Sequence, residues 1–232
     1  MYKSHDNKIQ ENSINAAATL KENGFIASKI YGNLAKIAND LKLPLLEDNV
    51  RWLQMGLIAQ EIERKKLNGA IAELGVYRGG FSRFISKAFK NRKYYLFDTF
   101  EGFDPRQIDF DQKKFNAIGH NFKNTSMQIV MDALNKSNNL EIIFKKGFFP
   151  ESAQGTDDTF VFVSVDVDLY EPTRDALWYF YPKMAPGGYI MVHDLMANRY
   201  QGCRQAVYEF CDSMNISFVP LPDAICSALI VK

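Results

Sequence analysis

Apolar residues follow two different spacings in this chain, and the spacing changes near residue 70. Before that point they recur every three to four positions, the period of an amphipathic helix, in residues 15–44 and again in residues 49–66. After it, short β-branched and aromatic runs alternate with helical patterns. This organisation predicts an N-terminal helical cap over residues 1–67, followed by one α/β domain over residues 68–232.

The helix predicted for residues 49–66 has the clearest of the N-terminal patterns, with Leu53, Leu57 and Ile58 expected on its apolar side. Two shorter helices are expected around Gly24. Such a cap can pack against a sheet, serve as a lid, or join two copies of the chain into a homo-oligomer. The sequence leaves these three roles open.

The second part of the chain alternates strands and helices. Strands are expected at residues 70–74, 93–98, 140–147 and 160–170, then at a segment ending on His193 and Asp194, and at the closing pair 217–222 and 227–232. Helices are expected at residues 81–91, 126–137, 172–181 and 201–213. The fold class is therefore α/β, with a Rossmann-like sheet of seven strands and helices on both faces.

The run FVFVSVDVDLY, residues 160–170, is apolar on both faces and predicts the central strand. Asp166 and Asp168 end it, where open α/β sheets bind ligands. If the strand kept its pleat there, both carboxylates would face one ligand, and two such charges need a cation or a shared proton. Alternatively, Asp168 begins the turn into the next helix and Asp166 is only solvated.

A glycine-rich turn, GVYRGG at residues 75–80, separates the first strand of the domain from its helix. Glycines allow the backbone to approach a ligand closely, and this arrangement is typical of nucleotide sites. Glu73 precedes the turn, and the spacing ExGxxxGG differs from the GxGxxG of dinucleotide sites. The turn therefore favours a smaller nucleoside ligand over a dinucleotide.

Asp98 ends the next strand, about twenty residues after the glycine turn, where an acid commonly binds ribose hydroxyls. Phe100 and Phe103 follow and can stack on a base, although dense aromatic residues also form cores. Residues 104–125 are polar and predict a mobile flap.

Composition limits the classes of partner. Lys and Arg total 28 against 27 acids, a net charge of +1, so no overall field attracts nucleic acid or an anionic membrane. No run of eighteen apolar residues and no secretory signal is present, which predicts a cytoplasmic protein without a membrane span. Cys203, Cys211 and Cys226 have no metal-binding spacing and are expected to be reduced core thiols.

Six stretches together resemble class I S-adenosylmethionine-dependent methyltransferases, and more closely the macrocin O-methyltransferase family, which methylates sugar hydroxyls of glycosylated natural products. They are AELGVYRGG, FDTFEGF, KKGFFPES, VDVDLYEPTRDAL, YPKMAPGGYIMVHD and GCRQAVYEF, within residues 70–210. The resemblance implies a methyltransferase sheet, S-adenosylmethionine as methyl donor, and a small sugar-containing acceptor.

The resemblance also implies site residues. Those expected to bind the methyl donor are Glu73, Gly75, Tyr77, Gly79, Gly80, Asp98, Thr99, Phe100, Gly147, Phe148 and Asp166, with residues 146–148 near the adenine. Asp166, His193 and Asp194 are the candidate ligands of a divalent cation, Mg²⁺ or Mn²⁺. The family has two adjacent carboxylates where this chain has His193 and Asp194, and imidazole is a poor partner for magnesium.

The expected chemistry is metal-assisted O-methylation. The cation would bind the acceptor hydroxyl and lower its pKa, while Asp166, Asp168 or His193 serves as catalytic base. The choice between these bases stays open at this point. Two alternatives also remain: a metal-dependent glycosyltransferase that uses the DxD of Asp166 and Asp168, and a methyltransferase-like binding protein without turnover.

Overall fold

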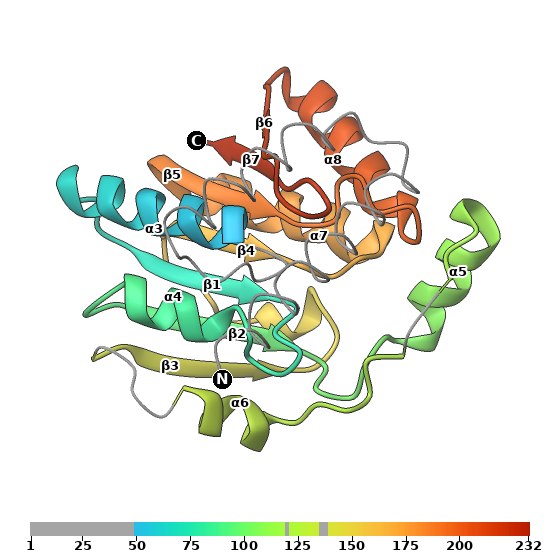
Figure 1. Ribbon diagram of the computed structural model, residues 1–232, viewed down its shortest axis with the longest axis horizontal. Helices are drawn as coiled ribbons and strands as arrows, with labels where there is room; N and C mark the ends of the chain where they lie inside the picture. Colours follow the sequence, from blue (N-terminus) through green and yellow to red (C-terminus); the bar gives the residue numbers. More distant parts are fainter. Residues whose placement is uncertain (1–48, 119–120, 135–138) are drawn as a thin grey trace, which may run out of the picture.

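A computed structural model describes residues 49–118, 121–134 and 139–232. The helices expected within residues 15–44 lie outside the described residues. Seven strands form one sheet in the order β3-β2-β1-β4-β5-β7-β6 (Figure 1), in which the first five are parallel and the pairs β5-β7 and β6-β7 are antiparallel. The α/β fold class and the seven-stranded sheet are confirmed.

The strands follow the predicted ranges closely. Their bounds are β1 Ala70–Leu74, β2 Lys93–Asp98, β3 Glu141–Lys146, β4 Phe160–Val165, β5 Met184–Val192, β6 Val219–Pro220 and β7 Ala228–Val231. All six residues of β4 are buried, as expected of a central strand covered on both faces. This strand ends at Val165, earlier than predicted, so both aspartates lie beyond the sheet in the following turn.

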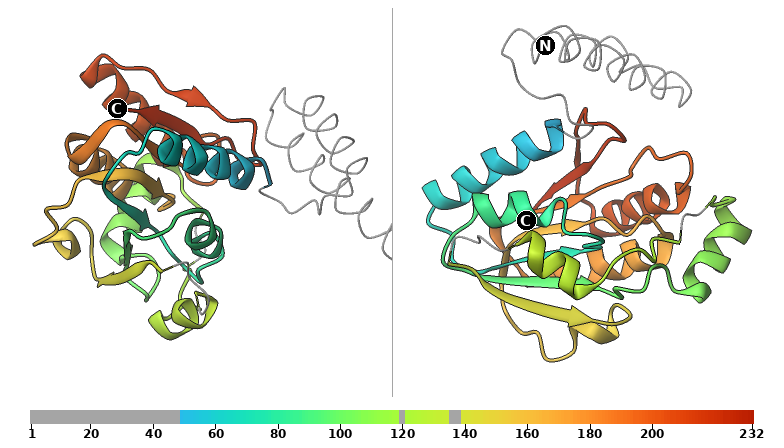
Figure 2. Two further views of the ribbon diagram at one scale, coloured as in Figure 1. Left: turned by 90° about the vertical axis from the view of Figure 1, so that its left-hand side faces the viewer. Right: turned by 60° about the horizontal axis from the view of Figure 1, so that its bottom comes forward.

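Helices cover both faces of the sheet (Figures 1 and 2). Their bounds are α3 Asn49–Arg64, α4 Ser82–Ala88, α5 Pro105–Phe115, α6 Met127–Ala133, α7 Tyr170–Phe180 and α8 Gln201–Met214, with short 3₁₀ turns at Glu151–Ala153 and Tyr181–Lys183. One apolar core includes residues of α3, α4 and α6, and the other includes residues of α7 and α8. Among the described helices, none is long and apolar enough to span a membrane.

Helix α3 confirms the helix predicted for residues 49–66, but its buried side differs from the expected one. Met55, Ile58, Ala59 and Ile62 are buried in the core on this face of the sheet. Leu53 and Leu57 are exposed, at 61% and 58%. The buried residues recur at the i, i+3, i+4 and i+7 positions of one helix face, starting from Met55. Leu53 and Leu57 lie on the opposite face.

Helix α5 occupies the polar stretch for which a flap without regular structure was expected. Asp104 caps it by accepting a hydrogen bond from the Arg106 backbone N–H at 2.8 Å, Pro105 occupies the first turn, and Asn116 ends it with a left-handed backbone. Its inward residue Asp111 is fully buried and accepts the Tyr170 backbone N–H at the start of α7. Helix α5 is therefore attached to the α7 side of the molecule.

Candidate active site

A cavity of about 930 Å³ lies at the carboxyl ends of the parallel strands. Most of the residues predicted for the site line it: Glu73, Gly75, Tyr77, Gly80, Asp98, Thr99, Gly147, Phe148, Asp166, Asp168, His193 and Asp194. Gly79 instead faces Val130 and Ala133 of α6, and Phe100 packs in the core with its ring 5.8 Å from Phe144. For Phe100, the structure therefore favours the core role over base stacking.

The glycine turn after β1 is shaped by close backbone contact. Gly75 has a φ of +87°, and a Cβ there would lie 1.8 Å from the carbonyl oxygen of Asp166. Only glycine permits this approach between the end of β1 and the turn after β4. The first glycine therefore brings the nucleoside-type turn directly beside the acidic residues.

Asp98 organises this turn through backbone hydrogen bonds. Its Oδ2 accepts the N–H groups of Val76 and Tyr77, both at 2.8 Å, and its Oδ1 accepts that of Phe100 at 2.7 Å. The Thr99 hydroxyl also donates to Oδ1, at 3.4 Å, so one of the roughly four acceptor sites of this carboxylate is held only by a long hydrogen bond that a ligand hydroxyl can replace. The acid thus fixes the loops after β1 and β2 while lining the cavity.

Glu73 is buried beneath the glycine turn at 1% exposure. Its Oε2 accepts hydrogen bonds from the Ser82 hydroxyl at 2.6 Å and from the Tyr94 hydroxyl. Burial raises its pKa to about 7, although these two hydrogen bonds favour the ionised form. Glu73 therefore links β1, β2 and α4 at the floor of the cavity.

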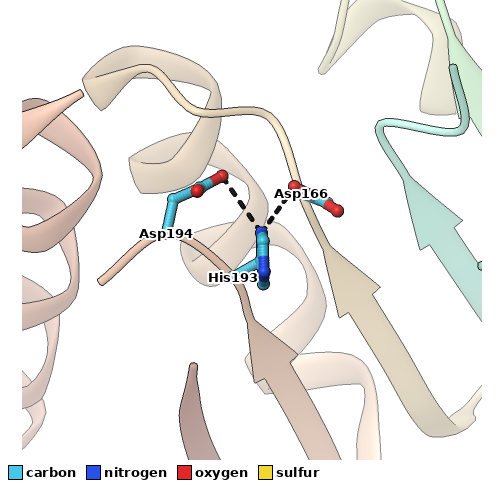
Figure 3. Close-up of side chains that lie close together, drawn as sticks. All are labelled: Asp166, His193 and Asp194. Carbon is cyan, nitrogen blue, oxygen red and sulfur yellow. Dashed lines mark hydrogen bonds and ion pairs between the residues drawn. The ribbon is translucent and has the colours of Figure 1, made fainter. Parts of the chain in front are cut away.

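Asp166, His193 and Asp194 come together at the ends of β4 and β5 (Figure 3). The His193 Nδ1 lies 3.2 Å from Asp166 Oδ1 and 3.2 Å from Asp194 Oδ2. Two adjacent strand residues would face opposite ways, but β5 ends at Val192 and Asp194 has a φ of +63°. This change of backbone direction brings both neighbouring side chains to the site.

Arg51 of α3 also reaches these residues and was not among the predicted site residues. Its Nη1 donates to Asp166 Oδ2 at 2.9 Å, and its guanidinium lies 3.9 Å from the centre of the Phe81 ring. The side chain is only 3% exposed. The signal for Arg51 is its position one helical turn before Met55, on the same buried face of α3. A charged residue on such a face requires a buried partner.

The charges of this cluster act on one another. Burial opposes ionisation of Asp166, but the positive charges of His193 and Arg51 lower its pKa below the usual range. Burial and Arg51 oppose protonation of His193, yet the carboxylates of Asp194 and Asp166 raise its pKa well above the usual value. Asp166 is therefore a stable anion with both oxygens engaged.

Asp168 lies in the same cavity but is not paired with Asp166. It has a φ of +61°, outside the pleat of β4, and its carboxyl hydrogen-bonds to Asp194. Burial and the charges of Asp194 and Asp166 raise its pKa well above the usual value. The two acids of the DxD thus have different partners.

The three clustered side chains offer the donor atoms of a divalent-cation site. One donor atom from each of Asp166, His193 and Asp194 lies within 4.8 Å of the others, which is compact enough to surround one ion. Two carboxylates and one imidazole suit manganese and similar metals better than magnesium, which prefers oxygen alone. The residues therefore fit an imidazole-tolerant divalent cation.

The family model for Macrocin-O-methyltransferase (TylF) matches residues 46–223, most of the chain and all of the site described above. This chain belongs to the macrocin O-methyltransferase family. The Mycinamicin III 3''-O-methyltransferase of Micromonospora griseorubida is 27% identical over 168 residues, covering 66% of this chain and 65% of the relative. Demethyldecarbamoylnovobiocin O-methyltransferase of Streptomyces niveus is 26% identical over 171 residues, covering 68% and 64%.

The chain thus spans slightly less than two thirds of the curated relatives it matches. Solved structures share its fold. The O-methyltransferase NovP superposes with a TM-score of 0.64 at 23% identity over 79% of each chain. The calicheamicin methyltransferase CalS11 superposes with a TM-score of 0.63 at 17% identity, covering 95% of this chain and 91% of its own. The methyltransferase fold implied by the six sequence stretches is confirmed.

Proposed function

We propose that this protein transfers a methyl group from S-adenosylmethionine to a hydroxyl of a sugar or of a glycosylated metabolite. The observation that carries the proposal is one cavity that joins the glycine turn and Asp98 to the acidic cluster at the ends of β4 and β5. Family membership and relatives named for sugar-containing natural products support it.

The turn after β1 and Asp98 are the proposed donor site. Gly75 packs against the backbone of Asp166, and the turn lines the cavity with Gly75, Tyr77 and Gly80, where the donor would lie. Asp98 would accept hydrogen bonds from the ribose hydroxyls. Gly147 and Phe148 line the same end of the cavity, where the adenine is expected. Because the sulfonium already activates the methyl group, the protein mainly has to align the acceptor oxygen and remove its proton.

Asp168 is the proposed base for that proton in its ionised form; because burial and the charges of Asp194 and Asp166 raise its pKa well above the usual value, methyl transfer is expected to increase as the pH rises. Both oxygens of Asp166 are engaged, one by Arg51 and one by His193, whereas the carboxyl of Asp168 lines the cavity and contacts Asp194. Asp166 then serves to hold His193 and Arg51 in place. This proposal chooses among the bases that the sequence left open.

A divalent cation is proposed at Asp166, His193 and Asp194. When bound there, it would lower the pKa of the acceptor hydroxyl and fix its direction. The buried charge of Arg51, which holds the second oxygen of Asp166, opposes a further cation at this place. We therefore expect weak, reversible metal binding with manganese preferred over magnesium.

The alternatives account for less of the site. A glycosyltransferase would need Asp166 and Asp168 to act on one nucleotide-bound cation, but the two acids have different partners and would leave Asp98 without a role. A binding protein without turnover would retain the cavity and differ only in activity. The test below separates these possibilities.

The experiment combines binding and turnover. Calorimetry with S-adenosylhomocysteine tests the donor site, and transfer of labelled methyl groups to TDP-rhamnose and to rhamnosyl glycosides, with and without Mn²⁺, tests the reaction. Binding together with methylated sugar is the expected result. Binding without transfer to any acceptor would support the non-catalytic alternative, and absence of binding would refute the methyltransferase assignment.

Four further expectations remain predictions. They are a cytoplasmic location, no nucleic-acid partner, a homo-oligomer formed through the N-terminal helices, and a boundary near residue 67 between the cap and the catalytic domain. The oligomer prediction rests on the cap of residues 1–67, of which residues 1–48 lie outside the described part of the chain. The proposed boundary must also take account of α3, because this helix is buried in the core of the sheet.

A further inference from the structure

The cavity has a second wall that begins beside the donor loops, since the rings of Phe122 and Tyr77 lie 5.3 Å apart, and that continues to the loop after β5. It comes from α5 and its flanking loops, from the loop after β5, and from Ile225. The residues are Phe103, Gln107, Phe122, Ala197, Asn198, Arg199, Tyr200 and Ile225. In open α/β sheets, two ligands that react with each other meet across the strand ends, so this wall is where an acceptor would lie.

Gln107 is the unusual residue of this wall. It is only 8% exposed and lines the cavity, yet its side-chain amide hydrogen-bonds to none of the residues that the structure describes. Its amide is not among the fully buried polar groups without a partner, so it is open to the cavity that Gln107 lines. An amide in this position is available to hydrogen-bond a ligand in the cavity.

Helix α5, which carries Gln107, is held in place by its packing on α7 and α8. Both oxygens of Asp111, one turn after Gln107, accept the Tyr170 backbone N–H, at 2.9 and 3.1 Å. A Cβ on Gly202 of α8 would lie 2.6 Å from Asp111, so the three helices are in close contact. A side chain supported in this way can select a ligand by geometry.

The surroundings indicate the chemistry of the partner. Phe103 lies with its ring centre 5.0 Å from Phe122 and 5.9 Å from Tyr200, forming an aromatic wall. A pyranose ring offers an apolar face of C–H groups and hydroxyls at its edge, and each hydroxyl both donates and accepts. The amide of glutamine supplies one acceptor and two donors, which matches a pair of neighbouring hydroxyls.

We propose that Gln107 is a specificity-determining residue that hydrogen-bonds a hydroxyl adjacent to the one that is methylated. This inference rests on the proposed function and deepens it, since it names the vicinal diol of the acceptor sugar as the recognised group. Sites built to hydrogen-bond a hydroxyl reject analogues that lack it. Gln107 would therefore determine which sugars are methylated, and it would not change the binding of S-adenosylmethionine.

The test compares Gln107→Leu with Gln112→Leu, an exposed glutamine on the same helix. With TDP-rhamnose or a rhamnosyl glycoside as acceptor, Gln107→Leu should lower kcat/KM for the acceptor by about 10- to 100-fold. Affinity for S-adenosylhomocysteine should not change. Acceptors lacking the neighbouring hydroxyl should be discriminated by the wild type and by Gln112→Leu, but no longer by Gln107→Leu.

The melting temperature gives an independent readout. Because the amide has no partner among the described residues, Gln107→Leu should melt no lower than Gln112→Leu. A lower melting temperature, or unchanged acceptor kinetics and discrimination, would overturn the inference while leaving the proposed function intact. If the wild type itself methylates none of the sugars, the proposed function fails first and the inference falls with it.

Discussion

The two ends of the cavity are built in different ways. At the donor end, Asp98 is held by backbone N–H groups of Val76, Tyr77 and Phe100, which lie within about one strand-helix-strand unit of it. At the acidic end, side chains from distant segments meet: Arg51 and Asp166 are separated by 115 positions. The first arrangement depends on local turn geometry, and the second on buried charges that must be paired by the whole fold.

The largest expected effect comes from breaking the ion pair between the buried guanidinium of Arg51 and Asp166, whose side chain is 26% exposed. Asp166→Ala should lower the free energy of unfolding by about 4 kcal/mol, because the Arg51 guanidinium then loses its carboxylate in a buried position. Urea denaturation measures this. Glu61→Ala, which removes an exposed ion pair on the same helix as Arg51, should change the free energy of unfolding far less, because solvent screens that pair.

Adding Arg51→Met to Asp166→Ala should recover part of that loss, because no buried charge is then left without its carboxylate. If Asp166→Ala and Glu61→Ala lowered the free energy of unfolding equally, the ion pair of Asp166 would be no more important for stability than a surface ion pair.

A pH dependence is expected from Glu73. Its folded-state pKa of about 7 lies above the usual value, so the protonated carboxyl stabilises the fold below about pH 4.5, and this contribution is lost as the pH rises through 7. Relative to Glu73→Gln, the wild type should lose about 3 kcal/mol of stability between pH 4.5 and 8. If the free energies of unfolding of the two proteins changed in parallel across this pH range, the raised pKa of Glu73 would be contradicted.

A smaller effect is expected at the donor end. Asp98→Ala should weaken binding of S-adenosylhomocysteine by about 2 kcal/mol, since it removes an acceptor of charge-assisted hydrogen bonds and loosens the turn at Val76 and Tyr77. Calorimetry measures it, with exposed Asp212→Ala as control. An unchanged affinity of Asp98→Ala for S-adenosylhomocysteine would show that Asp98 does not bind the ribose.

The smallest effect concerns the identity of the metal. His193→Asp should shift the preference from Mn²⁺ toward Mg²⁺ by about tenfold, because it replaces an imidazole with a carboxylate oxygen. Titration of each metal into the protein measures the two affinities without requiring turnover. An identical ratio in wild type and variant would mean that His193 is not a ligand.

The sequence by itself determined the sheet and the glycine turn with Asp98 beside it. Strand periodicity, the glycine turn and the acid at the end of β2 are local signals, since turn geometry and alternation depend on near neighbours. They predicted β1 to β5, Gly75 and Asp98 correctly in position. The same signals did not predict where β4 ends. The pattern FVFVSVDVDLY does not show at which residue the strand becomes a turn.

Only the tertiary structure decided the acidic end and the acceptor wall. The burial of Arg51, the separation of Asp166 from Asp168 and the approach of His193 beside Asp194 follow from helix docking and from left-handed backbone at two turns. The place of Gln107 in the cavity wall follows from the packing of α5 against α7 and α8. Pairing of charges and amides distant in sequence depends on which elements meet in space, and no local pattern contains that information.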